Sequence, residues 1–133
     1  MLFGQEHVQR YVETDGEEGH DWQGTTALIL TTTGRRSGVP RPTPLIYQSD
    51  GDAFVVVASK GGADVDPGWY LNLVEHPEVQ VQVRGDRFAA RARTATAQEK
   101  PSLWQKMVAA WPAYDDYRQK TDREIPVVVL ERV

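Results

Sequence analysis

Several β-rich segments of this chain are joined by turns that are too short to hold a helix, and this spacing limits the available folds more than any other feature. Asp50–Asp52 and Arg84–Asp86 each leave only three residues between two such segments. A parallel crossover needs about a dozen residues, so these neighbours must pair as antiparallel hairpins. Apolar or alternating patterns predict six strands, at Ala27–Thr33, Thr43–Ser49, Ala53–Ser59, Val79–Val83, Arg87–Thr96 and Ile125–Leu130.

About three helices are expected around these strands. Leu2–Val12 has a short, weak apolar face, whereas Gln98–Trp111 gathers its large apolar residues on one side. Asp66 and Pro67 are typical of the N-cap and first residue of a helix that continues over Trp69–His76. The sequence therefore predicts an α+β, mainly β fold: a small barrel of about six strands with helices packed outside it.

The chain of 133 residues has the length of one ordinary domain. We expect a single domain over residues 1–133, in which residues 1–24 form the N-terminal helix and an acidic loop. Glu13–Asp21 holds five carboxylates and two glycines, a composition typical of a solvated loop. A metal site through His20 and these acids is an alternative, although the spacing matches no ligand motif.

Composition and charge exclude several classes of function. The formal net charge of −4 argues against nonspecific nucleic-acid binding, which depends on a broad basic face. The absence of cysteine excludes a thiol nucleophile and a cysteine-ligated zinc site. No apolar run approaches the roughly 20 residues of a membrane span, and the N-terminus lacks the apolar core of a signal peptide. We therefore expect a cytoplasmic protein with at most peripheral contact at the inner face of the membrane.

A glycine-rich connection leads from the third predicted strand into the second predicted helix. Gly61 and Gly62 allow backbone conformations and close approaches that a Cβ would prevent. Such a loop directs backbone N–H groups and the positive end of the helix dipole toward one place, where Lys60 adds a full charge. The pattern is neither a Walker loop nor a G-x-G-x-x-G motif. It indicates an anion site, or else a loop whose glycines only turn the chain.

A second basic turn favours the anion interpretation. Arg35, Arg36 and Arg41 lie between the first and second predicted strands. If the two strand ends are neighbours, these arginines and Lys60 converge on the helix start before Trp69. Arginine is suited to bidentate contacts with phosphate and carboxylate groups. A solvated turn would explain any one of the arginines, but their coincidence with the glycine loop favours an anionic ligand.

The side chains offer little covalent chemistry of their own. His7, His20 and His76 lie beside no obvious nucleophile or metal partner at motif spacing. If the chain is an enzyme, a bound organic cofactor is the expected source of reactivity.

An aromatic triplet, Trp111, Tyr114 and Tyr117, recurs every three residues near one helical face. Tyrosine hydroxyls can bond a carbonyl-like oxygen, and the rings can stack on a flat ligand. The triplet is therefore a candidate wall of a ligand pocket, with ordinary core packing as the alternative.

With these segments placed, the chain resembles the deazaflavin-dependent nitroreductase family, whose members use coenzyme F420. The resemblance extends from about Thr25 to Val129. It rests on LTTTGRRSG-x-PR-x-x-PL, SKGG-x-x-x-x-P-x-WYLNL-x-x-x-P-x-VQV and Y-x-x-Y…TDR-x-IP, in this order. The resemblance implies a split β-barrel of the flavin-reductase, FMN-binding-like type. It also implies hydride transfer from reduced F420 to a small electrophilic acceptor: a quinone, an enone or a nitroheterocycle.

The resemblance further implies a set of site residues and no metal. The phosphate and oligoglutamate tail of the cofactor would meet polar and cationic residues, namely Arg35, Arg36, Ser37, Arg41 and Lys60. The deazaflavin ring would lie near two strand ends and a helix start, at Pro44, Ala58, Ser59, Gly61, Pro67, Gly68 and Trp69, with Asn72 close by. The acceptor pocket would hold the catalytic hydroxyls of Ser59, Tyr114 and Tyr117, together with Trp111.

Other functions stay open beside the F420-dependent reductase. A non-catalytic carrier of F420 would use the same binding residues, and an FMN-dependent reductase would use the same barrel. The number of cations exceeds what one phosphate needs, which favours the longer anionic tail of F420. The expected partner is a small-molecule electron acceptor and not a nucleic acid, and the sequence is compatible with a monomer or a homodimer.

Overall fold

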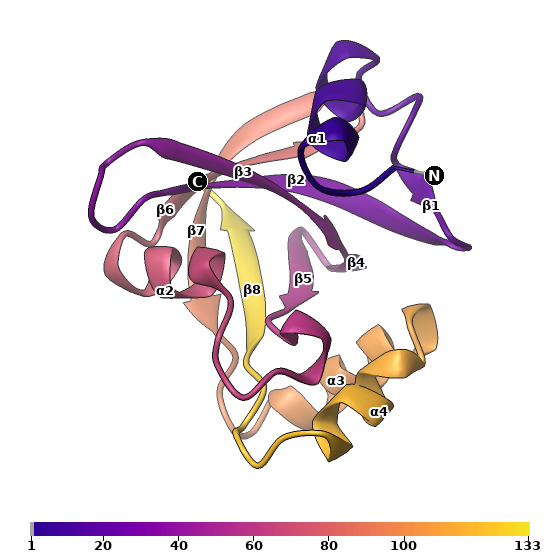
Figure 1. Cartoon of the computed structure of the whole chain (residues 1–133), viewed down its shortest axis with the longest axis vertical. Helices are drawn as coiled ribbons and strands as arrows, with labels where there is room; N and C mark the ends of the chain where they lie inside the picture. Colours follow the sequence, from indigo (N-terminus) through magenta and orange to yellow (C-terminus); the bar gives the residue numbers. More distant parts are fainter. Residues whose placement is uncertain (1) are drawn as a thin grey trace.

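A strongly curled antiparallel sheet forms the centre of the molecule, with helices on its outer side (Figure 1). The computed structural model describes residues 2–133, so Met1 of the predicted domain lies outside the described residues. The elements are α1 (Gly4–Glu13), β1 (Asp21–Trp22), β2 (Thr25–Thr33), β3 (Pro40–Ile46), β4 (Gln48–Asp50), β5 (Ala53–Val57), the 3₁₀ turn η1 (Lys60–Gly62), α2 (Gly68–Glu75), β6 (Glu78–Val83), β7 (Asp86–Thr94), α3 (Lys100–Ala110), α4 (Ala113–Gln119) and β8 (Val127–Arg132).

The strand order is β1-β2-β6-β7-β8-β5-β4, and β3 pairs with β2 beside this path. All of these pairings are antiparallel, as the short turns require for the hairpins β4–β5 and β6–β7. The predicted class, a mainly β barrel with helices outside, is confirmed, but the described chain has eight strands and not six. One additional strand, β1, has only two residues, too few to leave a sequence pattern. The other arises because the predicted strand Thr43–Ser49 is interrupted at Tyr47, which separates β3 from the three-residue β4.

The second predicted strand begins three residues earlier than expected, at Pro40 and not at Thr43. Pro40, Pro42 and Pro44 alternate along β3, so their missing N–H groups all fall on one side of the strand. The other side pairs with β2 over seven residues. Proline is compatible with such a strand because the edge that lacks donors faces away from its partner, and there the carbonyl of Pro42 accepts a bond from Gln5.

The predicted N-cap of α2 is wrong. Helix α2 begins at Gly68, and Pro67 occupies the cap position with no side-chain bond. The carboxylate of Asp66 instead accepts a hydrogen bond from Arg123, 2.9 Å away. A charge-assisted bond to a largely buried guanidinium is stronger than a bond to a backbone N–H, so the tertiary contact prevails over the local signal.

The prediction of a solvated loop over Glu13–Asp21 is also wrong at its C-terminal end. Asp21 begins β1, and His20 is only 5% exposed. His20 bonds the hydroxyl of Tyr47 at 2.7 Å and the carboxylate of Asp21 at 3.0 Å. These bonds satisfy both ring nitrogens and explain why a histidine in an acidic segment is buried.

The helices cover different parts of the sheet. Helix α1 packs Val8 and Tyr11 onto β2, and α3 lies close to its predicted bounds. The short helix α4, which follows α3 after Pro112, was not predicted as a separate element. In Figure 1, α3 and α4 lie at the opposite end of the molecule from α1, and α2 lies beside β6 and β7. Within residues 2–133, none of the helices has the length and apolarity to cross a membrane.

Strands β5 and β8 are apolar on both faces because each face meets a different part of the core. Val56 and Val128 fill the inside of the curled sheet. Val55 and Val127 pack on the other face, against Met107 of α3 and its neighbours. This two-sided burial makes β5 a rigid base for the glycine-rich connection that follows it.

Candidate functional site

Two cavities meet at the start of α2, and Trp69 lines both of them. One, the aromatic cavity, is predominantly apolar and rich in aromatic rings, and has a volume of about 380 Å³. The other is a cationic cleft of about 370 Å³. Together they form an elongated candidate site in which one end suits a flat ring and the other end suits negative charge.

The aromatic cavity gathers residues from segments that are distant in the sequence. Pro44, Leu45 and Ile46 of β3 and Val57 of β5 supply part of its apolar lining. Nine residues that the sequence proposed for the site line this cavity: Pro44, Ser59, Lys60, Gly61, Pro67, Trp69, Trp111, Tyr114 and Tyr117. Ala58 differs from its neighbours, because it is fully buried and lines neither cavity.

The N-terminal segment forms a wall of the aromatic cavity that the sequence did not predict. Phe3, His7 and Trp22 line it, and their rings pack on one another, with centroids 5.6 Å apart for Phe3 and Trp22 and 5.9 Å apart for His7 and Trp22. The ring of Trp22 also packs on that of Trp111, with the two centroids 5.8 Å apart. This pair joins the N-terminal wall to the aromatic triplet. The sequence signal for this wall was Trp22 itself, a large apolar ring directly after an acidic segment, because such a ring is expected to pack against another apolar group.

The aromatic triplet packs into the core and also lines the cavity, so the two interpretations of it are compatible. Tyr114 is buried against Trp104, at a ring distance of 6.3 Å, and lies 6.1 Å from Tyr117 in an edge-to-face arrangement. Burial raises the pKa of Tyr114 well above its ordinary value of 10. Its hydroxyl is therefore harder to ionise than that of an exposed tyrosine, and it remains a hydrogen-bond donor even at alkaline pH.

The glycine-rich connection has an unusual backbone. Lys60, Gly61 and Gly62 have φ values of +47°, +63° and +85°, three successive residues in the left-handed region. A Cβ on Gly62 would lie 2.8 Å from the carbonyl oxygen of Tyr117. The turn therefore packs directly on α4, and glycine is required at the point of contact.

The cationic cleft is formed by the turn between β2 and β3 and by the start of α2. Arg35, Arg36 and Arg41 line it, together with Ser37, and no acidic residue does. Within residues 2–133, none of the three arginines forms an ion pair with a carboxylate. Lys60 lines the aromatic cavity and not this cleft, so the predicted convergence of four cations is limited to the three arginines.

Asn72 holds the arginine turn against α2. Its side chain is buried, and its Oδ1 accepts bonds from the backbone N–H of Arg35 at 3.1 Å and from the guanidinium of Arg35 at 2.9 Å. Its Nδ2 donates to the hydroxyl of Thr32 at 3.1 Å. Asn72 lines this cleft and not the aromatic cavity, although the resemblance placed it close to the deazaflavin ring. Its bonds to the arginine turn give it a positioning role beside any contact with a ligand.

The alternative of a metal site at His20 finds no geometric basis. Among residues 2–133, no group of three histidine, aspartate or glutamate side chains is arranged to hold a metal ion. The two partners of His20 are instead Tyr47 and Asp21.

Comparison with known proteins gives a consistent family assignment. The family model described as F420H(2)-dependent quinone reductase matches residues 3–132. The F420H(2)-dependent quinone reductase Rv1261c of Mycobacterium tuberculosis is 42% identical over 131 residues, which cover 95% of this chain and 87% of that protein.

Two solved structures are also similar. One, described as an F420-H2 dependent reductase, is 38% identical, covers 79% of this chain and 93% of its own, and has a TM-score of 0.74. Another, described as a domain-swapped dimer, is 36% identical, covers 96% of both chains and has a TM-score of 0.77. These matches confirm the resemblance to deazaflavin-dependent enzymes. The chain belongs to the F420H(2)-dependent quinone reductase family.

Proposed function

We propose that this protein is an F420H2-dependent oxidoreductase that transfers a hydride to a quinone-type acceptor. The observation that carries the proposal is that Trp69 lines both an aromatic cavity and an adjoining cleft. The arginines of that cleft form no ion pair with a carboxylate of residues 2–133. F420 has a flat deazaflavin ring and a tail with a phosphate and several glutamates. The flat ring suits the apolar, aromatic lining of one cavity, and the anionic tail suits the arginines of the other.

The proposed binding residues divide between the two ends of the site. Arg35, Arg36 and Arg41, with Ser37, hold the anionic tail through charge-assisted hydrogen bonds. The aromatic cavity would hold the ring, with Pro44, Ser59, Gly61 and Pro67 among the residues that line it. Bound F420H2 supplies the hydride, from C5 of its reduced ring.

The residues of this chain position the acceptor and control protons. The aromatic walls exclude water and favour a flat, uncharged acceptor. Conversion of a quinone to a hydroquinone takes up one proton with the hydride, and the hydroxyls of Ser59, Tyr114 and Tyr117 line the cavity as candidate donors. The ammonium group of Lys60 favours negative charge that develops on the acceptor oxygen.

A turnover assay tests the proposal. Purified protein is mixed with F420H2 and a water-soluble naphthoquinone, and the return of the oxidised deazaflavin absorbance is followed. We expect enzyme-dependent oxidation that saturates with both substrates. Tight binding of F420 without turnover across several quinones, enones and nitroheterocycles would instead identify a carrier.

The related structure described as a domain-swapped dimer makes a homodimer the assembly to test. Light scattering on the purified protein distinguishes a monomer of 15.0 kDa from a dimer of twice that mass.

A further inference from the structure

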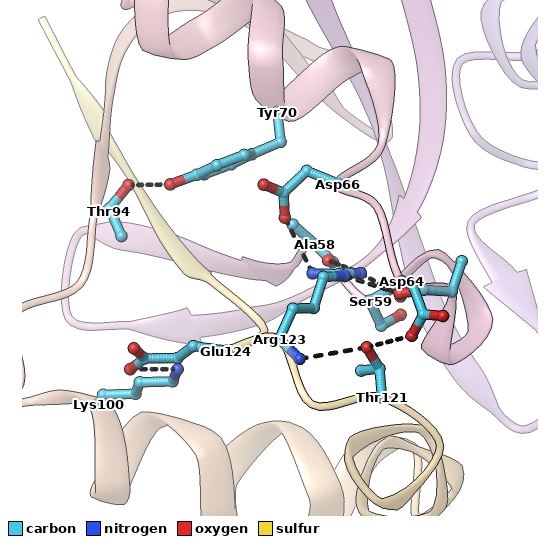
Figure 2. Close-up of polar contacts among 11 residues, drawn as sticks. Ala58, Ser59, Asp64, Asp66, Tyr70, Thr94, Lys100, Thr121, Arg123 and Glu124 are labelled. Carbon is cyan, nitrogen blue, oxygen red and sulfur yellow. Dashed lines mark hydrogen bonds and ion pairs between the residues drawn. The ribbon is translucent and has the colours of Figure 1, made fainter.

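Arg123 has a largely buried side chain whose hydrogen bonds all end on one connection of the chain. The side chain is 14% exposed, and its guanidinium lies against the segment from Ala58 to Asp66, which joins β5 to α2 (Figure 2). Nε donates to the carbonyl of Ala63 at 2.7 Å, and Nη1 donates to the carboxylate of Asp66 at 2.9 Å. Nη2 donates to the carbonyls of Ser59, at 2.8 Å, and Ala58, at 3.3 Å.

We propose that Arg123 is a positioning residue that acts through the backbone of this connection to hold Ser59 and Lys60 toward the aromatic cavity. Arg123 lines neither the aromatic cavity nor the cationic cleft, so it has no direct route to a ligand there. Both Ser59 and Lys60 line the aromatic cavity. The catalytic part of this inference rests on the proposed function, whereas its structural part does not.

The connection needs an external restraint because its own bonds are few. Inside it, the N–H of Gly62 bonds the carbonyl of Ser59 at 3.0 Å, and the N–H of Ala63 bonds the carbonyl of Lys60 at 3.1 Å. Lys60 is a non-glycine residue at φ +47°, in the left-handed region that strains any residue with a Cβ. A guanidinium that binds four acceptors along the segment offsets this strain and selects one arrangement.

The segment that carries Arg123 is itself tied to the same connection. The hydroxyl of Thr121 donates to the carboxylate of Asp64 at 2.7 Å and accepts the backbone N–H of Arg123 at 3.2 Å. Figure 2 shows these bonds side by side with those of the guanidinium. Through Thr121 and Arg123, the Thr-Asp-Arg motif before β8 therefore restrains the connection that carries Ser59 and Lys60 at several points.

The test replaces Arg123 with lysine, which keeps the charge but removes the planar set of donors. One ammonium group cannot reach acceptors on three sides, so we expect amide hydrogen exchange over residues 59–63 of the ligand-free protein to become about tenfold faster or more. Arg91→Lys is the matched control, because Arg91 is exposed and bonds a single carboxylate, that of Glu78, at 3.0 Å. The control should leave exchange over this segment unchanged.

Kinetic measurements separate positioning from general stability. Arg123→Lys should lower kcat for quinone reduction by about tenfold, because the groups at the reacting centre are misplaced. It should change the Kd for F420 by less than about threefold, because the arginines of the cationic cleft are untouched. Asp66→Asn, which leaves the three carbonyl acceptors in place, should give an intermediate decrease in kcat.

Exchange and kcat equal to those of the control would overturn the inference. It would also be overturned if exchange increased equally over the whole chain, since that would show a general loss of stability. If the wild-type protein does not oxidise F420H2, the proposed function fails, but the exchange measurement still decides the role of Arg123.

Discussion

Individual side chains of the site play two kinds of role, since some face the cavities and others hold the cavity-facing residues in place. Tyr114 and Lys60 face a cavity. Asn72 and Arg123 bond backbone and side-chain groups of the loops that carry the cavity-lining residues. Substitution of Asn72 should therefore lower both stability and F420 binding, whereas substitution of Arg123 should lower catalysis with little change in F420 binding.

Asn72→Ala tests the attachment of the arginine turn to α2. The substitution leaves the backbone N–H of Arg35 and the hydroxyl of Thr32 without their partner in a site where Asn72 is only 6% exposed. We expect the free energy of unfolding to fall by about 1–3 kcal/mol, as measured by urea denaturation. F420 titration should show weaker binding. Unchanged stability and affinity would show that the turn is held by other contacts.

The buried tyrosines make a prediction about pH. Burial raises the pKa of Tyr11 to about 12, and burial also raises the pKa of Tyr114 above its ordinary value. In the unfolded chain both groups titrate near pH 10, so the folded state keeps its protons to higher pH. The contribution of these tyrosines to the free energy of unfolding should therefore be constant up to about pH 10. It should fall as the pH rises through about 12, and Tyr11 should account for roughly 3 kcal/mol of the decrease.

Urea denaturation between neutral and alkaline pH measures this decrease, and tyrosinate absorbance reports the ionisation itself. A single absorbance transition near pH 10 for all five tyrosines, with constant stability, would contradict the burial of these hydroxyls.

At the scale of elements, the site depends on contacts between short segments that are distant in sequence. Turn η1 packs on α4, and the segment of β1 packs on the linker between α3 and α4 through Trp22 and Trp111. Each contact sets the distance between two walls of the aromatic cavity.

Gly62→Ala should separate η1 from α4. The new Cβ would lie 2.8 Å from the carbonyl oxygen of Tyr117 at a φ of +85°, so both a clash and backbone strain arise. Gly61→Ala is the matched control, because Gly61 has a φ of +63° but no atom within 4 Å of the added Cβ. Thermal unfolding should show a loss of about 1–2 kcal/mol for the control and a larger loss for Gly62→Ala. Equal losses would contradict the close contact.

Trp22→Ala should open the acceptor end of the site. The substitution removes the ring that joins Phe3 and His7 to Trp111. We expect the KM for the quinone to rise by roughly threefold to tenfold, which corresponds to the loss of one aromatic contact, with little change in the Kd for F420. Trp22→Phe should retain most of the affinity for quinone. A rise in the Kd for F420 without a change in the KM for the quinone would show that Trp22 contacts F420 and not the quinone.

At the scale of the whole molecule, the sequence predicts what local patterns encode and misses what the curl of the sheet brings together. The arginine turn and the Lys60–Gly62 turn were predictable because residue type and spacing mark them. It was not predictable that the arginines line one cavity and Lys60 the other, because this depends on the relative position of two strand ends. Trp22 stands out in its polar segment, but no local pattern indicates that its partner is Trp111, almost ninety residues away.

Arg123 is a second case in which a contact between distant segments could not be predicted from the local sequence. The sequence places it in a polar turn before β8, and there its neighbours give no reason to expect burial. Its guanidinium nevertheless takes the carboxylate of Asp66 away from the predicted N-cap. A local capping signal is worth about 1 kcal/mol, which a charged tertiary partner readily exceeds.

The cationic cleft should select the anionic tail of F420 over the single phosphate of FMN. The most direct measurement is a fluorescence titration with F420 and, separately, with FMN, on the wild-type protein and on an Arg36→Ala, Arg41→Ala double variant. We expect micromolar binding of F420 and weaker binding of FMN. The double substitution should weaken F420 binding by about thirtyfold, or about 1 kcal/mol for each exposed arginine, and added salt should weaken it further. Equal affinity for the two ligands, or F420 binding that the double substitution leaves unchanged, would contradict the account.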